Sequence, residues 1–298
     1  MTTHATRTFG SLAPAMVTPF TEDGALDVES AVRLARKLVQ DGCDAILLSG
    51  TTGESPTTHQ PEKNELTAAV IEAVGKEVFV FCGAGSNDTA HAVRIAQGAQ
   101  ENGAHGLLVV TPYYNRPSQE GVQAHVRAIA DAVDLPIMLY DIPGRTGLAL
   151  SDETIDLLAH HPRIHALKDA TGNVAQGAER LRRTGLEWYS GDDGLNLAFL
   201  EAGGSGSVSV VAHVAAPYYR RMTDAFDRGE LEEAREIIRQ VQPLVDAIMG
   251  GGQGAVMAKW AVYLQGAIAS PTVRLPLVAP HDDEIERLSN AMKALGLL

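Results

Sequence analysis

Cysteine is scarce in this sequence: Cys43 and Cys82 are the only two among 298 residues, and they do not form a Cys-x-x-Cys pair. The usual zinc and redox spacings are therefore missing. Cys82 ends the apolar run Val78–Cys82, which predicts a small buried core residue rather than a reactive thiol. A chain of this length can bury a large core, so neither disulfides nor a structural metal are expected.

Positive charge is also scarce, because 24 lysines and arginines face 37 acidic residues and give a net charge of -13. Nucleic acids and anionic membrane surfaces select basic faces, so neither is an expected partner. No apolar run approaches the roughly 18 residues of a membrane span. Residues 1–7 lack the apolar segment of a signal peptide. We therefore expect a cytoplasmic protein.

Several catalytic motifs are missing as well. The glycine-rich segment Gly250–Gly254 lacks the Gly-Lys-Ser/Thr ending of a phosphate loop and does not follow a predicted strand. There is no Gly-x-Ser-x-Gly elbow, and the pair His160-His161 has no zinc-ligand spacing. Hydrolase, kinase and dehydrogenase functions therefore lack their usual motifs.

The sequence does contain a repeat of short apolar runs separated by amphipathic segments. Each run is about as long as a strand buried on both faces. Eight such units predict an α/β fold, a (β/α)8 TIM barrel; the alternative, a doubly wound open sheet, would need fewer units and a nucleotide fingerprint. The predicted strands are Leu12–Thr18, Ala45–Ser49, Val78–Ala84, Gly106–Thr111, Pro136–Asp141, Ile164–Lys168, Glu187–Ser190 and Gly206–Val210.

Helices are predicted between these strands, with Asp27, Ser118 and Ser151 as N-caps. From about Asp224 onward the pattern is mostly helical. We therefore expect residues 1–230 to form the catalytic barrel and residues 231–298 a C-terminal helical domain. The predicted helices are Val28–Gln40, Pro61–Val74, Thr89–Gln100, Glu120–Ala132, Asp152–His160, Val174–Arg183, Leu195–Glu201, Glu230–Ile248, Ala255–Leu264 and Asp282–Leu295.

Lys168 is the first candidate catalytic residue, because active sites of such barrels form at the carboxyl ends of the strands. It ends the apolar run Ile164–Leu167. Burial favours the neutral amine, which can attack a carbonyl and form a Schiff base. The alternative is a structural lysine paired with Asp169.

Further candidates follow other strands. Tyr140 ends the fifth strand, next to the strand of Lys168, and its phenol could transfer protons. The loop Gly50–Glu54 offers hydroxyls and backbone N–H groups to a carboxylate. Arg145 could bind a substrate carboxylate with two hydrogen bonds. The segment Thr111–Pro117 has two tyrosines and an arginine, which also suits an oligomer contact.

These segments together resemble the pyruvate-dependent class I aldolases typified by 4-hydroxy-tetrahydrodipicolinate synthase, with an actinobacterial character. The resemblance runs from about residue 10 to the C-terminus. The motifs that carry it are Gly50–Ser55, Thr111–Pro117, Tyr140–Gly147, Lys168–Asn173 and Ser190–Asp193.

The resemblance implies a role for each matching residue. Lys168 matches the Schiff-base lysine and Tyr140 the proton donor and acceptor. Thr51 and Tyr114 match the rest of a proton relay, the tyrosine entering the site from a neighbouring subunit. Thr52 matches the residue that binds the pyruvate carboxylate, and Arg145 the one that binds the carboxylate of the aldehyde. Val208 matches a backbone contact to pyruvate, and Gly191 of the Ser190–Asp193 segment is a further substrate-binding position.

The reaction implied by the resemblance is the condensation of pyruvate with L-aspartate 4-semialdehyde, the first committed step toward diaminopimelate and lysine. It implies no metal and no organic cofactor, because the lysine activates the carbonyl. It also implies a homotetramer built from tight dimers. The alternatives are a sister enzyme such as N-acetylneuraminate lyase or a 2-keto-3-deoxy sugar acid aldolase or dehydratase, and a non-catalytic keto-acid-binding homologue.

The sequence departs from this family at several positions. Gln253–Lys259 replaces an Asn-Pro-x-Pro-x-Lys run, and Asp141 stands where asparagine is common. Lysine-inhibited members bind lysine with histidines and a glutamate at the dimer interface, where this chain has Gln60, Lys63 and His91. A cationic side chain near a cationic ligand weakens binding. We therefore expect inhibition by L-lysine to be weak or absent.

Overall fold

The computed structural model describes residues 7–251 and 253–298. The N-terminal residues 1–6, for which no signal peptide is predicted, and Gly252 of the glycine-rich segment lie outside the described residues. Eight parallel strands form one sheet in the order β1-β8-β7-β6-β5-β4-β3-β2. They are β1 (Leu12–Pro14), β2 (Ala45–Leu48), β3 (Phe79–Gly83), β4 (Gly106–Val110), β5 (Ile137–Asp141), β6 (Ile164–Asp169), β7 (Glu187–Ser190) and β8 (Gly206–Ser209).

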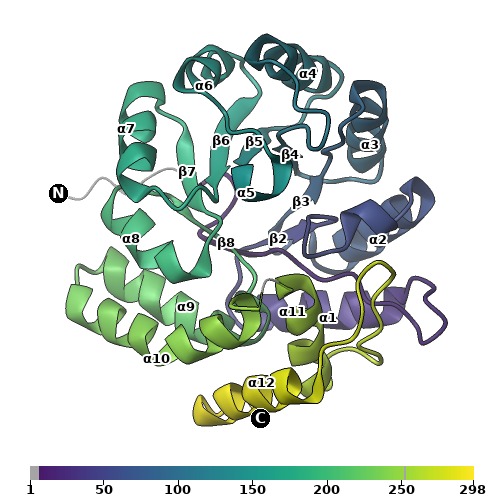
Figure 1. Ribbon diagram of the computed structural model, residues 1–298, viewed down its shortest axis with the longest axis vertical. Helices are drawn as coiled ribbons and strands as arrows, with labels where there is room; N and C mark the ends of the chain where they lie inside the picture. The colour runs from purple at the N-terminus through teal and green to yellow at the C-terminus, as the bar shows by residue number, and fades with distance from the viewer. Residues whose placement is uncertain (1–6, 252) are drawn as a thin grey trace.

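The sheet curves into a barrel with a ring of helices outside it (Figure 1). Met16 N donates to Leu47 O at 2.9 Å and links the chain after β1 to β2. The (β/α)8 TIM barrel predicted from the sequence is confirmed. The predicted strands lie within a few residues of the observed ones; the largest difference is β1, which ends at Pro14 rather than at Thr18.

The helices also follow the predicted pattern. Asp27, Ser118 and Ser151 accept hydrogen bonds from backbone N–H groups at the starts of α1, α4 and α6, as predicted. The barrel helices are α1 (Val28–Gln40), α2 (Gln60–Val74), α3 (Thr89–Glu101), α4 (Gln119–Asp131), α5 (Pro143–Thr146), α6 (Asp152–Ala159), α7 (Val174–Thr184), α8 (Asn196–Glu201) and α9 (Ala212–Asp227), with 3-10 turns η1 (Ser55–Thr57) and η2 (Asp193–Leu195).

Two helices differ from the prediction. Helix α9 begins at Ala212, whereas the sequence predicts a mostly helical pattern only from about Asp224 onward. The helical pattern before that residue is interrupted by Pro217 and by Ala215, whose backbone is non-helical. Helix α5 is absent from the prediction because its four residues are too few to show a helical period.

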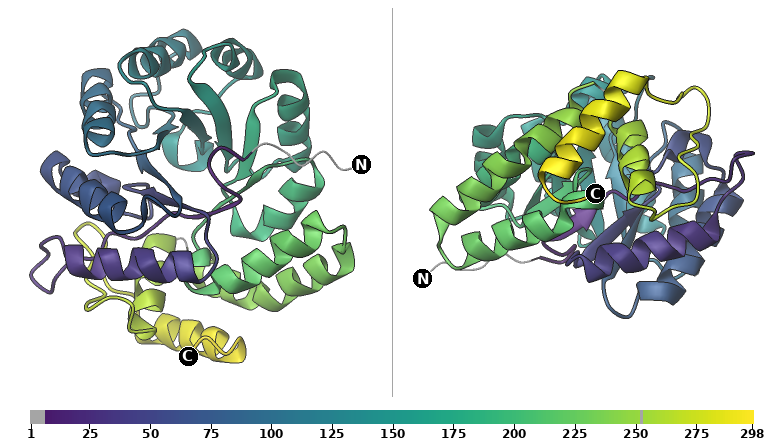
Figure 2. Two further views of the ribbon diagram at one scale, coloured as in Figure 1. Left: turned by 180° about the vertical axis from the view of Figure 1, so that it is seen from behind. Right: turned by 90° about the horizontal axis from the view of Figure 1, so that it is seen from below.

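After α9 the chain forms α10 (Leu231–Met249), α11 (Gly254–Leu264) and α12 (Asp282–Ala294). These helices gather on one side of the barrel, next to α1 and α9 (Figure 2). The division into two domains between residues 230 and 231 stays a prediction. In the described part of the chain, no helix combines the length and apolar character needed to cross a bilayer.

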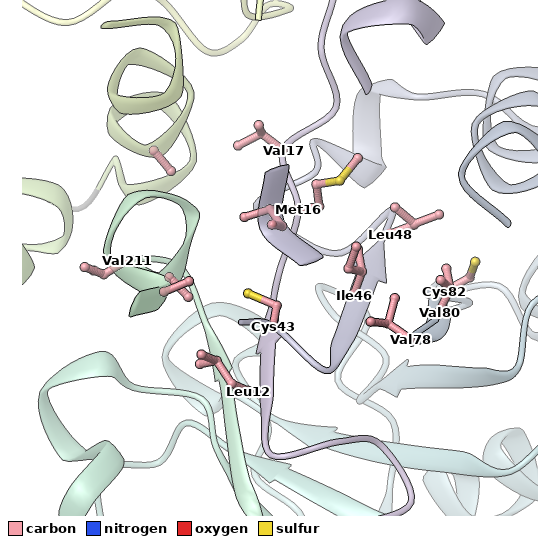
Figure 3. Packing of buried hydrophobic residues seen from close by; sticks show 14 of the residues in the cluster. Leu12, Met16, Val17, Cys43, Ile46, Leu48, Val78, Val80, Cys82 and Val211 are labelled. Atoms are coloured by element: carbon pink, nitrogen blue, oxygen red, sulfur yellow. The ribbon is translucent and has the colours of Figure 1, made fainter. Parts of the chain in front are cut away.

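Two apolar clusters make up the core. The outer one, between strands and helices, contains both Cys43 and Cys82 (Figure 3), and burial raises the pKa of the Cys82 thiol to about 11. Cys82 is thus the buried core residue that the sequence predicts. The inner cluster fills the barrel with alternate residues of the strands, Tyr140 among them. Strand alternation therefore turns Tyr140 inward, toward the barrel axis.

Candidate active site

A cavity of about 240 Å³ lies at the carboxyl ends of the strands. Its position agrees with the general location of active sites in this fold. Six of the eight predicted site residues line it: Thr51, Thr52, Tyr140, Arg145, Lys168 and Gly191. The remaining lining residues include Glu54 of the loop after β2 and residues that follow β1, β5 and β8. Others come from η1 and the C-terminal region, among them Met249, Gln253 and Leu277.

Lys168 is buried, with 5% of its surface exposed, near the end of β6. Burial lowers the pKa of its amine to about 8, with Arg145 acting in the same direction and Asp193 opposing. The structural pairing with Asp169 does not form in the described chain, because that carboxylate accepts from Thr171 N at 2.8 Å and Trp188 Nε1 at 3.2 Å. Lys168 is therefore held as a readily deprotonated amine that faces a cavity.

Tyr140 lies beside Lys168, in register with it across β5 and β6. The lysine nitrogen is 4.2 Å from the centroid of the Tyr140 ring. Burial raises the pKa of the phenol to about 12, while Arg145 and a side-chain hydrogen bond with Thr51 act against the increase. The phenol stays protonated at neutral pH and can pass a proton along the Tyr140–Thr51 hydrogen bond.

The loop after β2 places Thr51 and Thr52 at the cavity. Glycine is required at position 53, since a Cβ there would lie 2.9 Å from Met16 O. Thr18 Oγ1 donates to Gly53 O at 2.6 Å and ties the loop to the chain after β1. Thr52 is buried and lines the cavity, so the loop forms a fixed part of the cavity wall.

Two more residues complete the wall. Arg145 lies on the short helix α5 and lines the cavity. Gly191 follows β7 and leaves space for the lysine, because a Cβ at this position would lie 2.9 Å from Lys168 Cε. A lysine at the end of β6 thus requires glycine at the end of the neighbouring strand.

Two predicted residues are not among those that line this cavity. Val208 is buried in the inner barrel cluster, and Val210, which follows β8, lines the cavity instead. Tyr114 is 89% exposed, with a left-handed φ of 72° in the loop after β4. Within one chain, the described residues that line the Lys168 cavity do not include it.

A second cavity of about 320 Å³ adjoins the first and shares Thr51, Tyr140 and Arg145 with it. It contains all three residues at the predicted feedback positions, Gln60, Lys63 and His91. Lys63 donates to Ser55 O at 2.8 Å and to Thr58 O at 2.6 Å, and burial lowers its pKa to about 8. The described lining of this cavity holds no acidic side chain.

The sequence patterns do not identify two ionic residues next to the site. Glu54 lines the Lys168 cavity, and its carboxylate is paired with Lys259, which lies 205 residues later on α11. Lys259 is the only charged residue of the apolar helix Gly254–Leu264, and a lysine in such a helix is rarely buried unless it is paired. That pattern could have indicated the ion pair. No group of three potential metal ligands from histidine, cysteine or acidic residues occurs in the described chain.

Known proteins match this chain over nearly its whole length. A 4-hydroxy-tetrahydrodipicolinate synthase of Bifidobacterium longum is 50% identical over 290 residues, 97% of this chain and 96% of the relative. A solved dihydrodipicolinate synthase from Cyanidioschyzon merolae with lysine bound is 43% identical and superimposes with a TM-score of 0.93, covering 98% of this chain and 99% of that one.

Another solved relative, from Acinetobacter baumannii, is described as chloride inhibited and complexed with pyruvate. It is 33% identical, with a TM-score of 0.93, and the match covers 98% of this chain and all of that one (100%). Residues 8–295 match the dihydrodipicolinate synthetase family. These matches, on the fold and cavity described above, show that the chain belongs to the dihydrodipicolinate synthetase family.

Proposed function

We propose that this chain condenses pyruvate with L-aspartate 4-semialdehyde to 4-hydroxy-tetrahydrodipicolinate, through a Schiff base on Lys168. The observation that carries the proposal is the buried Lys168 amine, with its pKa lowered to about 8, beside Tyr140 in a cavity. A neutral amine in that position can attack the ketone of pyruvate. The family and its curated relatives favour this reaction over those of the sister aldolases.

The first steps use the lysine and the phenol. The Lys168 amine adds to the pyruvate carbonyl, and loss of water forms the imine. Tyr140 and Thr51 deliver and remove the protons, which their hydrogen bond supports. Thr52 binds the pyruvate carboxylate from the buried turn of the Gly50–Ser55 loop, and the backbone at Val208 and Gly191 provides further contacts to the substrate.

The carbon–carbon bond forms in the second half. The protonated imine withdraws electrons, so a methyl proton leaves and an enamine forms. The enamine carbon attacks the aldehyde carbon of the second substrate, whose carboxylate Arg145 binds. The amine of the product then closes the ring and displaces Lys168. The lysine itself activates the carbonyl, so the proposal includes no metal or organic cofactor.

A second subunit completes the site in this proposal. Tyr114 is fully available at the surface, with 89% of its area exposed, on a loop with two left-handed residues, Tyr114 and Arg116. Such an exposed ring on a strained loop suits insertion into a neighbouring copy. We therefore include Tyr114 of the partner subunit in the proton relay, within a cytoplasmic homotetramer of tight dimers.

The test of the proposal is reductive trapping. The protein is incubated with pyruvate and sodium borohydride, and its intact mass and peptides are measured. We expect one pyruvate adduct on the Lys168 peptide, absent in Lys168→Ala and retained in the control Lys76→Ala, which changes an exposed lysine. An adduct elsewhere, or none, contradicts the proposal and favours a non-catalytic homologue. Turnover with sugar-derived aldehydes but not the semialdehyde favours a sister enzyme.

A further inference from the structure

A buried ion pair connects the C-terminal helices to the loop of the active site. Lys259 Nζ on α11 donates to Glu54 Oε1, and the two side chains are 0% and 1% exposed. The same nitrogen donates to Thr272 O at 3.0 Å. The other carboxylate oxygen, Glu54 Oε2, accepts from the backbone N–H of Arg274 at 2.9 Å. Both carboxylate oxygens of Glu54 are thus held by residues that follow the barrel in sequence.

A shared aromatic ring supports these contacts. Lys259 Nζ lies 4.2 Å and Arg274 Cζ 4.1 Å from the centroid of Phe20. The guanidinium of Arg274 donates to Thr57 O at 2.7 Å and also pairs with Glu62 on α2. The segment around Arg274 therefore fixes both the Glu54 side chain and the turn that follows it.

Glu54 is under backbone constraint. Its φ of 54° and ψ of 40° are left-handed, a conformation that side chains other than glycine rarely adopt. Its N–H donates to Thr51 O at 3.1 Å, and its carbonyl accepts from Thr58 Oγ1 at 2.8 Å. A residue in this conformation persists only where its surroundings determine it. The contacts of the Glu54 side chain with Lys259 and Arg274 hold the residue in this conformation.

We propose that Lys259 is a positioning residue: through Glu54 it holds the Gly50–Ser55 loop so that Thr51 and Thr52 face the Lys168 amine. This inference rests on the proposed function, in which those threonines serve the proton relay and the pyruvate carboxylate. The chain after the barrel then has a role in pyruvate binding. A shift of the loop by about 1 Å is enough to lower catalysis strongly.

The test compares Lys259→Met with a control that removes an ion pair at the other end of the barrel. Arg7→Met is that control, because Arg7 pairs with Asp227 at 2.7 Å and donates to Ser205 O, just before β8 begins. We expect Lys259→Met to raise the KM for pyruvate at least about tenfold. Arg7→Met lowers Tm but leaves that KM within about twofold of the parent.

Rescue separates positioning from simple destabilisation. The double variant Glu54→Gln/Lys259→Met removes both charges of this ion pair, and the new amide can still accept from Arg274 N–H. We expect it to recover Tm but to keep a raised KM for pyruvate, because the contact from Lys259 that orients residue 54 is still missing. A normal KM in Lys259→Met despite a lower Tm overturns the proposal, as does a double variant in which the KM for pyruvate recovers together with Tm.

If Lys259→Met does not fold, the double variant Glu54→Gln/Lys259→Met alone decides, and a normal KM for pyruvate in that variant overturns the proposal. Borohydride trapping on Lys168 in the parent protein is measured in parallel. If the parent protein forms no adduct on Lys168, the proposed function is refuted. If the parent forms the adduct and the KM is unchanged in the variants, only the positioning role is refuted.

Discussion

Tyr140 and Lys168 occupy paired positions on neighbouring strands, and the lysine nitrogen lies 4.2 Å from the tyrosine ring centroid. Both side chains are buried, with 5% exposure each. Burial moves their pKa values in opposite directions, to about 8 for the amine and about 12 for the phenol. One environment thereby favours the neutral form of both groups, and the neutral amine is the form that attacks a carbonyl.

The pH dependence of imine formation follows from the pKa of Lys168. Only the neutral amine attacks, so the rate below saturating pyruvate rises with pH and levels off above about 8, where the amine is deprotonated. At pH 7 roughly one amine in ten is neutral, compared with roughly one in three thousand for an ordinary lysine. Rapid-quench borohydride trapping between about pH 6 and pH 10 measures this profile. A rate that climbs steadily up to pH 10 argues against a lowered pKa.

Gly191→Ala tests the close approach of the lysine. The added Cβ would lie 2.9 Å from Lys168 Cε and 3.1 Å from Ala170 Cβ, so the amine must move. We expect kcat/KM to fall about 100-fold, while circular dichroism shows a folded protein. The matched control is Gly121→Ala on α4, where the nearest atom is Pro117 Cβ at 3.2 Å and activity should be retained. Trapping at the parental rate in Gly191→Ala would show that the lysine does not need this space.

Arg145→Met tests recognition of the aldehyde. Loss of a charged hydrogen bond to the substrate carboxylate costs about 1.5–3 kcal/mol, which is roughly a 10- to 150-fold increase in the KM for the semialdehyde. Pyruvate trapping on Lys168 should continue, because the imine forms before the aldehyde binds. Steady-state kinetics with each substrate varied measures both effects, and the exposed Arg182→Met serves as the control. An unchanged aldehyde KM would exclude Arg145 as its ligand.

Subunit mixing tests the role of Tyr114. Lys168→Ala and Tyr114→Phe are each expected to be severely impaired. Dissociated and reassembled together, they form mixed dimers in which one of two sites has both native residues. Random pairing predicts recovery of about one quarter of the parental activity. Each variant reassembled alone is the control, and absence of recovery in verified mixed dimers would confine the site to one chain.

Inhibition by L-lysine is expected to be weak or absent. The second cavity presents the Lys63 ammonium and, among its described residues, no carboxylate to attract a second cation. An inhibition constant above about 1 mM in a kinetic assay agrees with this expectation, and a sub-millimolar value contradicts it. The triple variant Gln60→His/Lys63→His/His91→Glu, which restores the residue types of lysine-inhibited members, should become sensitive.

Much of the barrel is encoded locally. Apolar runs of strand length predict all eight strands, and capping side chains mark helix starts such as Asp27 before α1. The position of Lys168 at a strand end is also a local property, and the topology of the fold then places it near Tyr140. The short α5 carries too few residues for such a pattern, although it orients Arg145.

Other features depend on contacts between distant parts of the chain. The fit of Lys168 against Gly191 and the ion pair of Lys259 with Glu54 join residues that no sequence period connects. The sequence by itself determined the fold class and the residue types of the site, because periodicity and capping act over a few residues. Only the tertiary structure decided the burial that shifts the pKa of Lys168, since desolvation depends on every element packed around the amine.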